Sequence, residues 1–362
     1  MGIEKKLEAD IKTDVPIIIP AYEPTIVLCE LCQNLSLMTG GAIIVVNDGS
    51  STEYDPIFEK VEEKGCIVIR HAVNCGKGRG IKTAFHYVLN HYPEAIGTVT
   101  VDADGQHKPT DIIKVINALR ENHDSLILGV RNFDNANIPW KSKLGNKLTK
   151  AVSSYLCGVN VSDTQTGLRG IPRGFMQQLI NVSGERFEFE TNMLIEAKKM
   201  NVNIIEVSIE TIYDSKDNHK THFDPINDSI RIYRIFVWIF IKYLISSGSS
   251  FVIDIVMFLW FCRITRSNIP LYYVAVSTVF ARVISSIYNF IVNYIFVFKS
   301  KRNRSVSVVR YFSLVVVIMV ASALLTTVGV ALFNPSSETI IKVIVDTMLF
   351  FVCYKVQQMM VF

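Results

Sequence analysis

The last third of the chain is so apolar that it constrains the possible fold more than any other feature. Phe, Ile, Val, Leu and Tyr dominate it, in four runs over residues 247–261, 272–298, 311–333 and 340–361. A helix needs roughly 20 apolar residues to cross a bilayer, and only the first run falls short of this length. That run begins within the segment before it. The sequence therefore predicts a transmembrane domain with four helices over residues 247–362; a hydrophobic soluble bundle is the alternative.

Charged residues near these runs predict how the helices lie in the membrane. Residues 229–246 are apolar with Arg234, Trp238 and Lys242 interspersed, which predicts an amphipathic helix at the membrane interface. The basic segment 299–304 follows the second run, and the positive-inside rule places it in the cytoplasm. With four spans, the soluble domain and both termini then lie on the cytoplasmic side of the cell membrane. Arg263 and Arg266, in the opposite loop, weaken this orientation.

The part before residue 229 predicts an α/β domain over residues 15–228. Apolar runs at 15–20, 42–46, 66–70, 96–101 and 125–130 alternate with helical patterns at 25–37, 56–64, 80–90 and 111–121. Continuous apolar strands that alternate with helices favour a mainly parallel, Rossmann-like sheet covered on both faces. Residues 1–14 form a charged tail without the apolar core of a signal peptide.

Two carboxylates follow the strand predicted at 96–101. Asp102 and Asp104 are one residue apart, and Gln106 lies two residues further on. Mg²⁺ and Mn²⁺ prefer oxygen ligands of this kind and complete their coordination with phosphate. Ligands in open α/β sheets bind beyond the carboxyl ends of the strands, so the spacing predicts a nucleotide-diphosphate site. A solvated turn is the alternative for this pair taken alone.

Other strand ends carry further candidates. Glu23 follows the first strand, Asp48 the second and Arg131 the fifth. The basic, glycine-rich loop 74–80 precedes a helix, where Gly76 and Lys77 can offer an amide and a cation to phosphate. Neither the Walker A spacing nor the position of a Rossmann fingerprint is present.

Overall charge and cysteine usage exclude other classes. The net charge of +4, from 37 basic and 33 acidic residues, gives no argument for nucleic acid as a partner. Cys29 and Cys32 form a C-x-x-C pair within a helical pattern, without a second pair elsewhere. We expect buried, reduced thiols rather than a metal or redox site.

Together these segments resemble the family-2 glycosyltransferases of GT-A fold, in particular the dolichyl- and polyprenyl-phosphate hexose synthases. The resemblance covers about residues 14–225 and rests on segments 20–23, 47–50, 74–78, 102–107, 129–131 and 163–169. The membrane part is similar to the GtrA-like four-helix domain through segments 243–254 and 289–298. Fusion of two such domains is known among polyprenyl-phosphate glycosyltransferases.

The resemblance implies a set of site residues. For the metal, Mg²⁺ or Mn²⁺, they are Asp102, Asp104 and Gln106. For the nucleotide sugar they are Pro20, Tyr22, Glu23, Asn47, Asp48, Gly76, Lys77, Asp102, Ala103 and Asp104. For the acceptor phosphate they are Lys143, Thr166, Arg169, Lys216, Lys220 and His222. The residues implied in catalysis are Asp102, Asp104, Arg131 and Asp163.

The implied reaction moves a hexose from a UDP- or GDP-linked sugar to a polyprenyl (undecaprenyl or dolichyl) phosphate, in one inverting displacement. Mannose-specific relatives carry an R-x-x-G-x-S-K segment before the membrane helices, which residues 213–225 lack, and Asn47 replaces a common Asp. The sugar, the lipid length and the oligomeric state are therefore open, an oligomer being possible. A processive polysaccharide synthase is one alternative, although its Q-x-x-R-W element is missing. A non-catalytic lipid-sugar translocator or scaffold is the other.

Two charges lie inside the predicted spans. Asp254 falls in the first run and Arg282 in the second. Charges within a bilayer are costly and are usually paired, so we expect these two side chains to contact each other.

Overall fold

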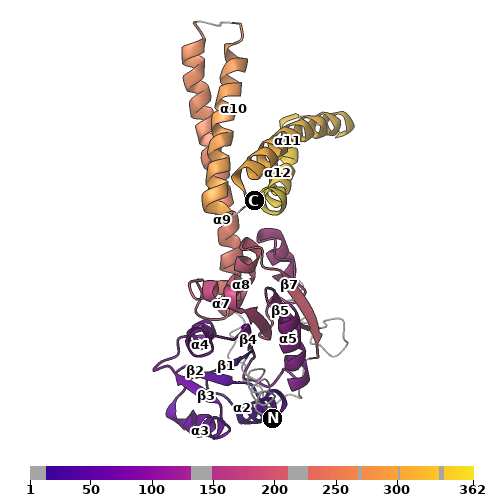
Figure 1. Cartoon of the computed structure of the whole chain (residues 1–362). Helices are drawn as coiled ribbons and strands as arrows, with labels where there is room; N and C mark the ends of the chain where they lie inside the picture. Colours follow the sequence, from indigo (N-terminus) through magenta and orange to yellow (C-terminus); the bar gives the residue numbers. More distant parts are fainter. Residues whose placement is uncertain (1–13, 132–148, 211–226, 268–270, 301, 334–337) are drawn as a thin grey trace. The chain divides into compact units, whose positions relative to one another are not determined.

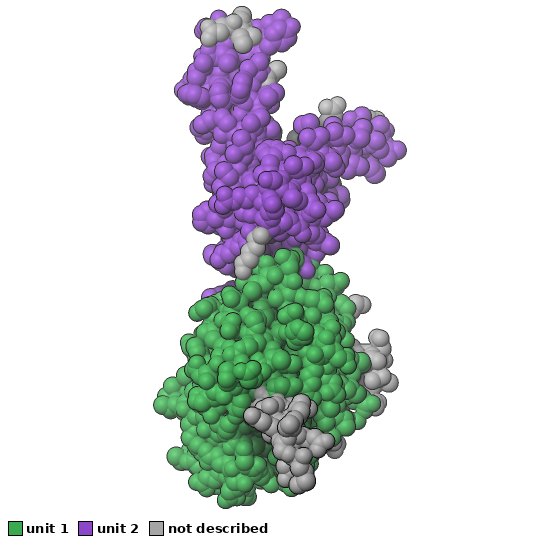
Figure 2. All heavy atoms as spheres, in the orientation of Figure 1, with its two compact units in different colours: residues 1–154, 159–233 green, residues 155–158, 234–362 purple. Residues whose placement is uncertain are grey.

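A computed structural model describes residues 14–131, 149–210, 227–267, 271–300, 302–333 and 338–362 (Figure 1). The chain divides into two compact units (Figure 2). The first contains residues 1–154 and 159–233, and the second contains residues 155–158 and 234–362.

One mixed sheet organises the first unit. Its seven strands are β1 (Ile17–Ala21), β2 (Ile43–Asn47), β3 (Ile67–Arg70), β4 (Gly97–Thr100), β5 (Leu126–Arg131), β6 (Arg169–Pro172) and β7 (Ile204–Ile209). Their order is β3-β2-β1-β4-β6-β5-β7, and β6 runs antiparallel to both of its neighbours while the other pairs are parallel. This confirms the predicted α/β, mainly parallel, Rossmann-like sheet. Strands β6 and β7 were not among the predicted strands.

The helices of this unit follow the predicted alternation. They are α2 (Val27–Thr39), α3 (Asp55–Glu63), α4 (Lys77–His91), α5 (Pro109–Glu121), α7 (Arg173–Leu179) and α8 (Glu188–Lys199). Local signals set their ends: Pro109 begins α5, a position where the missing N–H has no cost. Gly40 ends α2 in the left-handed conformation and donates its N–H to the Ser36 carbonyl.

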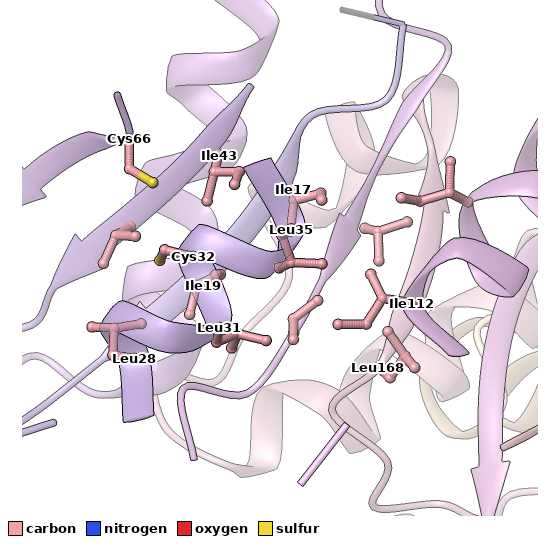
Figure 3. Close-up of a cluster of buried hydrophobic side chains, with 14 of the residues drawn as sticks. Ile17, Ile19, Leu28, Leu31, Cys32, Leu35, Ile43, Cys66, Ile112 and Leu168 are labelled. Carbon is pink, nitrogen blue, oxygen red and sulfur yellow. The ribbon is translucent and has the colours of Figure 1, made fainter. Parts of the chain in front are cut away.

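The hydrophobic core lies between the sheet and α2 (Figure 3). Leu28, Leu31 and Leu35 recur on one face of α2 and pack beside Ile17 and Ile19 of β1. Cys29 and Cys32 belong to the same buried cluster, and no disulfide joins any of the seven cysteines. The thiols of this pair are therefore core residues, as predicted.

The second unit is helical. It contains α9 (Asn227–Thr265, which starts in the first unit), α10 (Tyr273–Val292), α11 (Arg304–Phe333) and α12 (Glu338–Val356). Among the described residues, three helices are long and apolar enough to cross a membrane: Asn227–Thr265, Val276–Val297 and Arg304–Phe333. Four helices are thus present, but the predicted count of four spans is not confirmed.

The backbone is helical on both sides of residue 246, the predicted boundary before the transmembrane domain. The predicted interfacial helix 229–246 and the first span form one helix of 39 residues. No proline interrupts this segment, and Gly248 at its middle does not end the helix. A single glycine in a helix costs only about 1 kcal/mol relative to alanine, which the surrounding helix-compatible residues outweigh.

The two charges predicted to pair do contact each other. Arg282 Nη2 lies 3.6 Å from Asp254 Oδ2, and the Ser285 hydroxyl donates to Asp254 Oδ1 at 2.9 Å. These contacts join α9 to α10.

A buried hydrogen-bond network joins α10, α11 and the C-terminal turn. Asn293 Nδ2 donates to Asn289 Oδ1 at 2.9 Å and to Gln357 Oε1 at 3.0 Å, and the Tyr311 hydroxyl donates to Asn289 Oδ1 at 2.8 Å. Asn293 and Gln357 each begin a π-helical segment, Asn293–Val297 and Gln357–Val361. Such segments alter the helical register, and here they bring the two amides into contact.

We expect Asn293→Ala to lower the free energy of unfolding of the helical unit by about 1–2 kcal/mol, because interhelical hydrogen bonds of this kind contribute that much at most. Unfolding by increasing SDS in mixed micelles, followed by circular dichroism, measures the change. Thr347→Ala is the control, because the exposed Thr347 hydroxyl bonds only to the Val343 carbonyl of its own helix. Equal effects of the two substitutions would contradict a role for the network.

Candidate active site

The strand topology brings the predicted site segments to one edge of the sheet. The carboxyl ends of the parallel strands β1, β2, β4 and β5 share this edge. Strand β6 is antiparallel to its neighbours, so its amino end lies at this edge. There Arg169 is paired with Thr100 of β4 and Leu128 of β5. Segment 163–168, which precedes β6, therefore lies beside the residues that follow β4.

Asp102 is the centre of this site. Its Oδ1 lies 2.6 Å from Lys77 Nζ, and its Oδ2 lies 3.5 Å from His107 Nε2. Burial alone would raise the pKa of the Asp102 carboxyl, but the charge of Lys77 and the His107 hydrogen bond hold it well below its usual range. Asp102 is therefore an anion at neutral pH although it is largely enclosed.

Gly167 lies against the same carboxylate. A Cβ atom at this position would approach Asp102 Oδ2 to 2.1 Å and Oδ1 to 2.4 Å. The Thr100 hydroxyl, at the end of β4, donates to the Gly167 carbonyl at 2.9 Å and fixes the approach. Only glycine leaves room for Asp102 in its present position.

Lys77 connects Asp102 to a residue that the sequence did not indicate. Its Nζ lies 2.8 Å from Oε1 of Glu190, in the first turn of α8, and 5.6 Å from the ring centroid of Phe187. Burial alone would lower the pKa of Lys77, but Asp102 and Glu190 together raise it above its ordinary value. Lys77 is thus a permanent cation between two carboxylates.

Asp104 and Gln106 form the other part of the predicted metal site. The Gln106 amide N–H donates to Asp104 Oδ1 at 3.0 Å, in a turn where Gly105 has a φ of 72°. Burial and the nearby charge of Asp102 raise the pKa of the Asp104 carboxyl. Two enclosed carboxylates that repel each other, with an amide oxygen two residues on, fit a hard divalent cation, which would offset the repulsion. The residues therefore fit Mg²⁺ or Mn²⁺, and Ala103 between them packs against the core.

Asp48 holds the glycine-rich loop in place. Its Oδ1 accepts the Cys75 amide at 3.0 Å, its Oδ2 accepts the Gly76 amide at 2.6 Å, and His71 Nδ1 lies 2.7 Å from Oδ1. Gly76 has a φ of 100°, and a Cβ there would meet the Glu185 carbonyl at 2.5 Å, so this turn requires glycine. The ligand atoms of Asp48, His71 and Cys75 lie within 4.8 Å of one another, but two backbone amides already bind this carboxylate.

A short hydrogen-bond chain links the ends of β1 and β2. Asn47 Oδ1 accepts the Ser50 amide at 2.9 Å, and the Ser50 hydroxyl accepts the Glu23 amide at 2.8 Å. Glu23 has a φ of 45°, and a hydrogen bond from Tyr22 to its carboxylate raises the pKa of the tyrosine. Pro20 is buried within β1. These predicted nucleotide residues therefore lie near one another at the ends of β1 and β2, with Pro20 and Asn47 buried.

Arg131 and Asp163 form a two-pronged ion pair. Arg131 Nε donates to Asp163 Oδ2 at 2.6 Å, and Nη2 donates to Oδ1 at 3.1 Å. Asp163 is fully buried and also accepts the Gln165 amide at 3.1 Å. The Asp163 carboxylate therefore orients Arg131 and the following loop, a geometry that does not favour a general base.

Arg169 does not lie where an acceptor phosphate could contact it. Its guanidinium is fully buried and donates to the carbonyls of Thr166 (2.8 Å), Glu190 (2.6 Å) and Thr164 (3.2 Å). Thr166 is buried as well, and its hydroxyl donates to the Gly129 carbonyl at 2.5 Å. We correct the predicted direct contact of Arg169 and Thr166 with phosphate: both hold segment 163–168 against β5 and α8. The other predicted acceptor residues, Lys143, Lys216, Lys220 and His222, lie outside the described residues.

Three neighbours of Asp102 were not among the predicted site residues: Gly167, His107 and Glu190. Gly167 and His107 belong to segments 163–169 and 102–107, on which the family resemblance rests, so mutating every residue of those segments would have found them. Glu190 lies in no recognised segment. Only the packing of α8 against the start of α4 brings its carboxylate to Lys77.

Two families of proteins match the two units. The model of glycosyl transferase family 2 matches residues 17–180, and that of the GtrA/DPMS transmembrane domain matches residues 242–362. The site and fold therefore define a glycosyltransferase that carries a helical membrane domain. The chain belongs to glycosyl transferase family 2.

Individual relatives support this assignment. An uncharacterized protein of Methanocaldococcus jannaschii is 32% identical over 222 residues, covering 59% of this chain and 89% of that protein. A UDP-N-acetylglucosamine–dolichyl-phosphate N-acetylglucosaminyltransferase of Methanococcus voltae is 32% identical, covering 54% of this chain and 85% of that protein. A polyprenol monophosphomannose synthase of Mycolicibacterium smegmatis is 23% identical, covering 53% and 75% respectively.

Proposed function

We propose that this enzyme transfers a hexose from a UDP- or GDP-linked sugar to a polyprenyl phosphate, with Mg²⁺ or Mn²⁺ as cofactor. The observation that carries the proposal is the enclosed Asp102–Asp104 pair beside Lys77, in a glycosyl transferase family 2 domain joined to a GtrA/DPMS membrane domain. A membrane domain on a sugar transferase favours an acceptor that is itself in the membrane. The names of the relatives, one acting on dolichyl phosphate and one on polyprenol phosphate, support this acceptor class.

The chemistry requires a stabilised leaving group more than a strong base. A phosphate monoester has its second pKa near 6, so the acceptor oxygen is already a competent nucleophile at neutral pH. It attacks C1 of the sugar as the bond from C1 to the donor diphosphate breaks, which inverts the configuration at C1. Negative charge then grows on the diphosphate, and stabilising this charge is the principal catalytic task.

Each site residue has a proposed part in this task. Asp102, Asp104 and the Gln106 side chain would hold the divalent cation, which supplies charge stabilisation to the leaving diphosphate when bound. Arg131, oriented by Asp163, and Lys77 add positive charge near the same group. Glu23 would lie toward the nucleoside, while the buried Asn47 and Asp48 would contribute mainly by fixing the turn after β2 and the phosphate-side loop.

The location of the reaction is proposed from the charge pattern. The basic segment 299–304 favours a cytoplasmic position for the connection between α10 and α11. The site would then draw its nucleotide sugar from the cytoplasm and its lipid phosphate from the adjoining leaflet, where Lys216, Lys220 and His222 supply a basic segment.

The test uses the full chain purified in detergent, supplied with undecaprenyl or dolichyl phosphate, a panel of labelled UDP- and GDP-sugars, and Mg²⁺ or Mn²⁺. We expect one donor to give a butanol-extractable labelled lipid, with loss of product in excess EDTA and recovery when the cation is restored. Asp104→Asn should lower the rate about 10³-fold, since it weakens the stabilisation of the leaving group. Asp124→Asn, at a highly exposed acid just before the amino end of β5 and so away from the carboxyl ends that form the site, should leave the rate unchanged.

Other outcomes would overturn the proposal. A long labelled polymer would indicate the processive synthase instead. Absence of turnover with every donor would contradict a transferase and favour a non-catalytic role. Full activity of Asp104→Asn would instead contradict the proposed metal dependence.

A further inference from the structure

The ammonium of Lys77 contacts a carboxylate oxygen that the proposed metal ion would need as a ligand. Its ammonium lies 2.6 Å from Oδ1 of Asp102, the carboxylate proposed to bind the cation. The other oxygen, Oδ2, faces His107 at 3.5 Å and the backbone of Gly167. The positive charge of Lys77 would therefore repel a divalent cation that approaches Oδ1 of Asp102, so this oxygen is most available to the cation once Lys77 has moved away.

Glu190 provides a second contact for the same ammonium, one that does not involve Asp102. Its Oε1 lies 2.8 Å from Lys77 Nζ, and only about one twentieth of Glu190 is exposed. The backbone of Glu190 is held by Arg169, which donates to the Glu190 carbonyl at 2.6 Å. The carboxylate is thus a fixed anchor on α8, whereas Lys77 has a long, flexible side chain at the first residue of α4.

The charges around Asp102 also favour an exchange of the Lys77 ammonium for a divalent cation. With Asp102, Asp104 and Glu190 ionised, three carboxylates face one ammonium, which leaves a charge equal and opposite to that of one divalent cation. Without Lys77 the enclosed site would carry one more negative charge, at a high cost in desolvation and repulsion. With the cation bound, the ammonium is no longer needed at Asp102.

We propose that Lys77 is an exchangeable counter-ion of the metal site. It neutralises Asp102 while no cation is bound. When the cation and nucleotide enter, it leaves Asp102 for the donor diphosphate and keeps its contact with Glu190. Lys77 is the first residue of α4, and the start of a helix favours an anion, so a diphosphate bound there would meet both the helix dipole and the ammonium. This inference rests on the proposed metal-dependent function.

The exchange predicts two opposite effects of removing the ammonium. In Lys77→Met, Mn²⁺ should bind more tightly in the absence of nucleotide, by about tenfold, because no cation competes for Asp102. UDP or GDP, measured with Mn²⁺ present, should bind about tenfold more weakly, because one charge-assisted hydrogen bond to phosphate is lost. If Lys77 had only a structural role, its removal would not strengthen Mn²⁺ binding while weakening nucleotide binding.

Glu190→Gln should change metal affinity in the other direction. Lys77 would then keep only Asp102 as a partner, so Mn²⁺ should bind more weakly than to the wild type. Lys82→Met is the matched control: Lys82 is also buried on α4 and paired with a carboxylate, at 3.0 Å from Glu185, but this ion pair does not involve Asp102. Its Mn²⁺ affinity should equal that of the wild type.

Loss of the electron paramagnetic resonance signal of free Mn²⁺, titrated with the full chain in detergent, measures binding directly and does not depend on turnover. Circular dichroism confirms that each variant is folded, and Lys77→Gln replaces Lys77→Met if the latter does not fold. Unchanged or weaker Mn²⁺ binding in the Lys77 variant, while the wild type binds Mn²⁺, would overturn the inference and leave the proposed function standing. Absence of Mn²⁺ binding by the wild type, with and without UDP or GDP, would instead contradict the metal-dependent function, and the inference with it.

Discussion

Arg169→Met is expected to destabilise the sheet domain by about 3 kcal/mol, with little change in side-chain volume. The substitution removes the donors to three buried backbone carbonyls, those of Thr164, Thr166 and Glu190. A buried acceptor without a partner costs about 1–3 kcal/mol, and relief from burying the guanidinium charge offsets part of the sum. Burial already lowers the pKa of Arg169, so the charge is held at a cost.

The midpoint of thermal unfolding of the detergent-purified chain, measured by circular dichroism, should fall by about 6–12 °C for a domain of this size. Arg120→Met is the control. Arg120 makes its ion pair with Asp14 at the surface, at 2.8 Å, where such pairs contribute under about 1 kcal/mol. A drop in Arg169→Met no larger than that of the control would show that the buried guanidinium is dispensable.

Gly167→Ala is expected to lower the transfer rate about 10²-fold in a protein that remains folded. The new Cβ would overlap the Asp102 carboxylate, whose oxygens would lie 2.1 and 2.4 Å away. The side chain of Asp102 can rotate away more easily than the backbone can move, so the fold survives while the metal ligand is displaced. A displacement of about 1 Å at a reacting centre is enough for a 10²-fold loss.

The rate of labelled lipid formation and the Mn²⁺ affinity should fall together in Gly167→Ala. Gly174→Ala is the matched control, because a Cβ at Gly174, in α7, would meet no atom within 4 Å. There the substitution should preserve the rate and slightly raise stability, since alanine favours a helix. Full activity of Gly167→Ala would mean that Asp102 need not hold its present position.

Much of the fold could be predicted because short-range patterns determine it. The apolar runs that became β1, β2, β4 and β5 are fully or almost fully buried, and they alternate with amphipathic segments that became α2 to α5. Strand β6 escaped prediction because it is only four residues long, Arg169–Pro172, and begins with a charged residue that is normally exposed. The burial of Arg169 depends on three carbonyl partners, two in the segment just before the strand and one, that of Glu190, in α8.

The helical unit shows the same limit. Hydropathy indicated the apolar helices. The position of Asp254 and Arg282 inside predicted spans suggested their ion pair, which the structure confirms. The predicted interfacial segment 229–246 and the first predicted span share one helical backbone, so the boundary placed at residue 246 marks a change of composition and not a break in the helix. Composition changes along α9, whereas its hydrogen-bond pattern does not.

The sequence by itself determined that this chain is an α/β domain followed by apolar helices, and that acids stand at the end of the fourth strand. Apolar periodicity and the two-residue spacing of Asp102 and Asp104 are local properties, so they can be read without coordinates. The tertiary structure alone decided that Lys77 bridges Asp102 and Glu190, that Gly167 leaves room for Asp102, and that Arg169 is buried. The reason is physical: Lys77 and Glu190 are more than a hundred residues apart, and only the packing of α8 beside α4 places their charges within 3 Å.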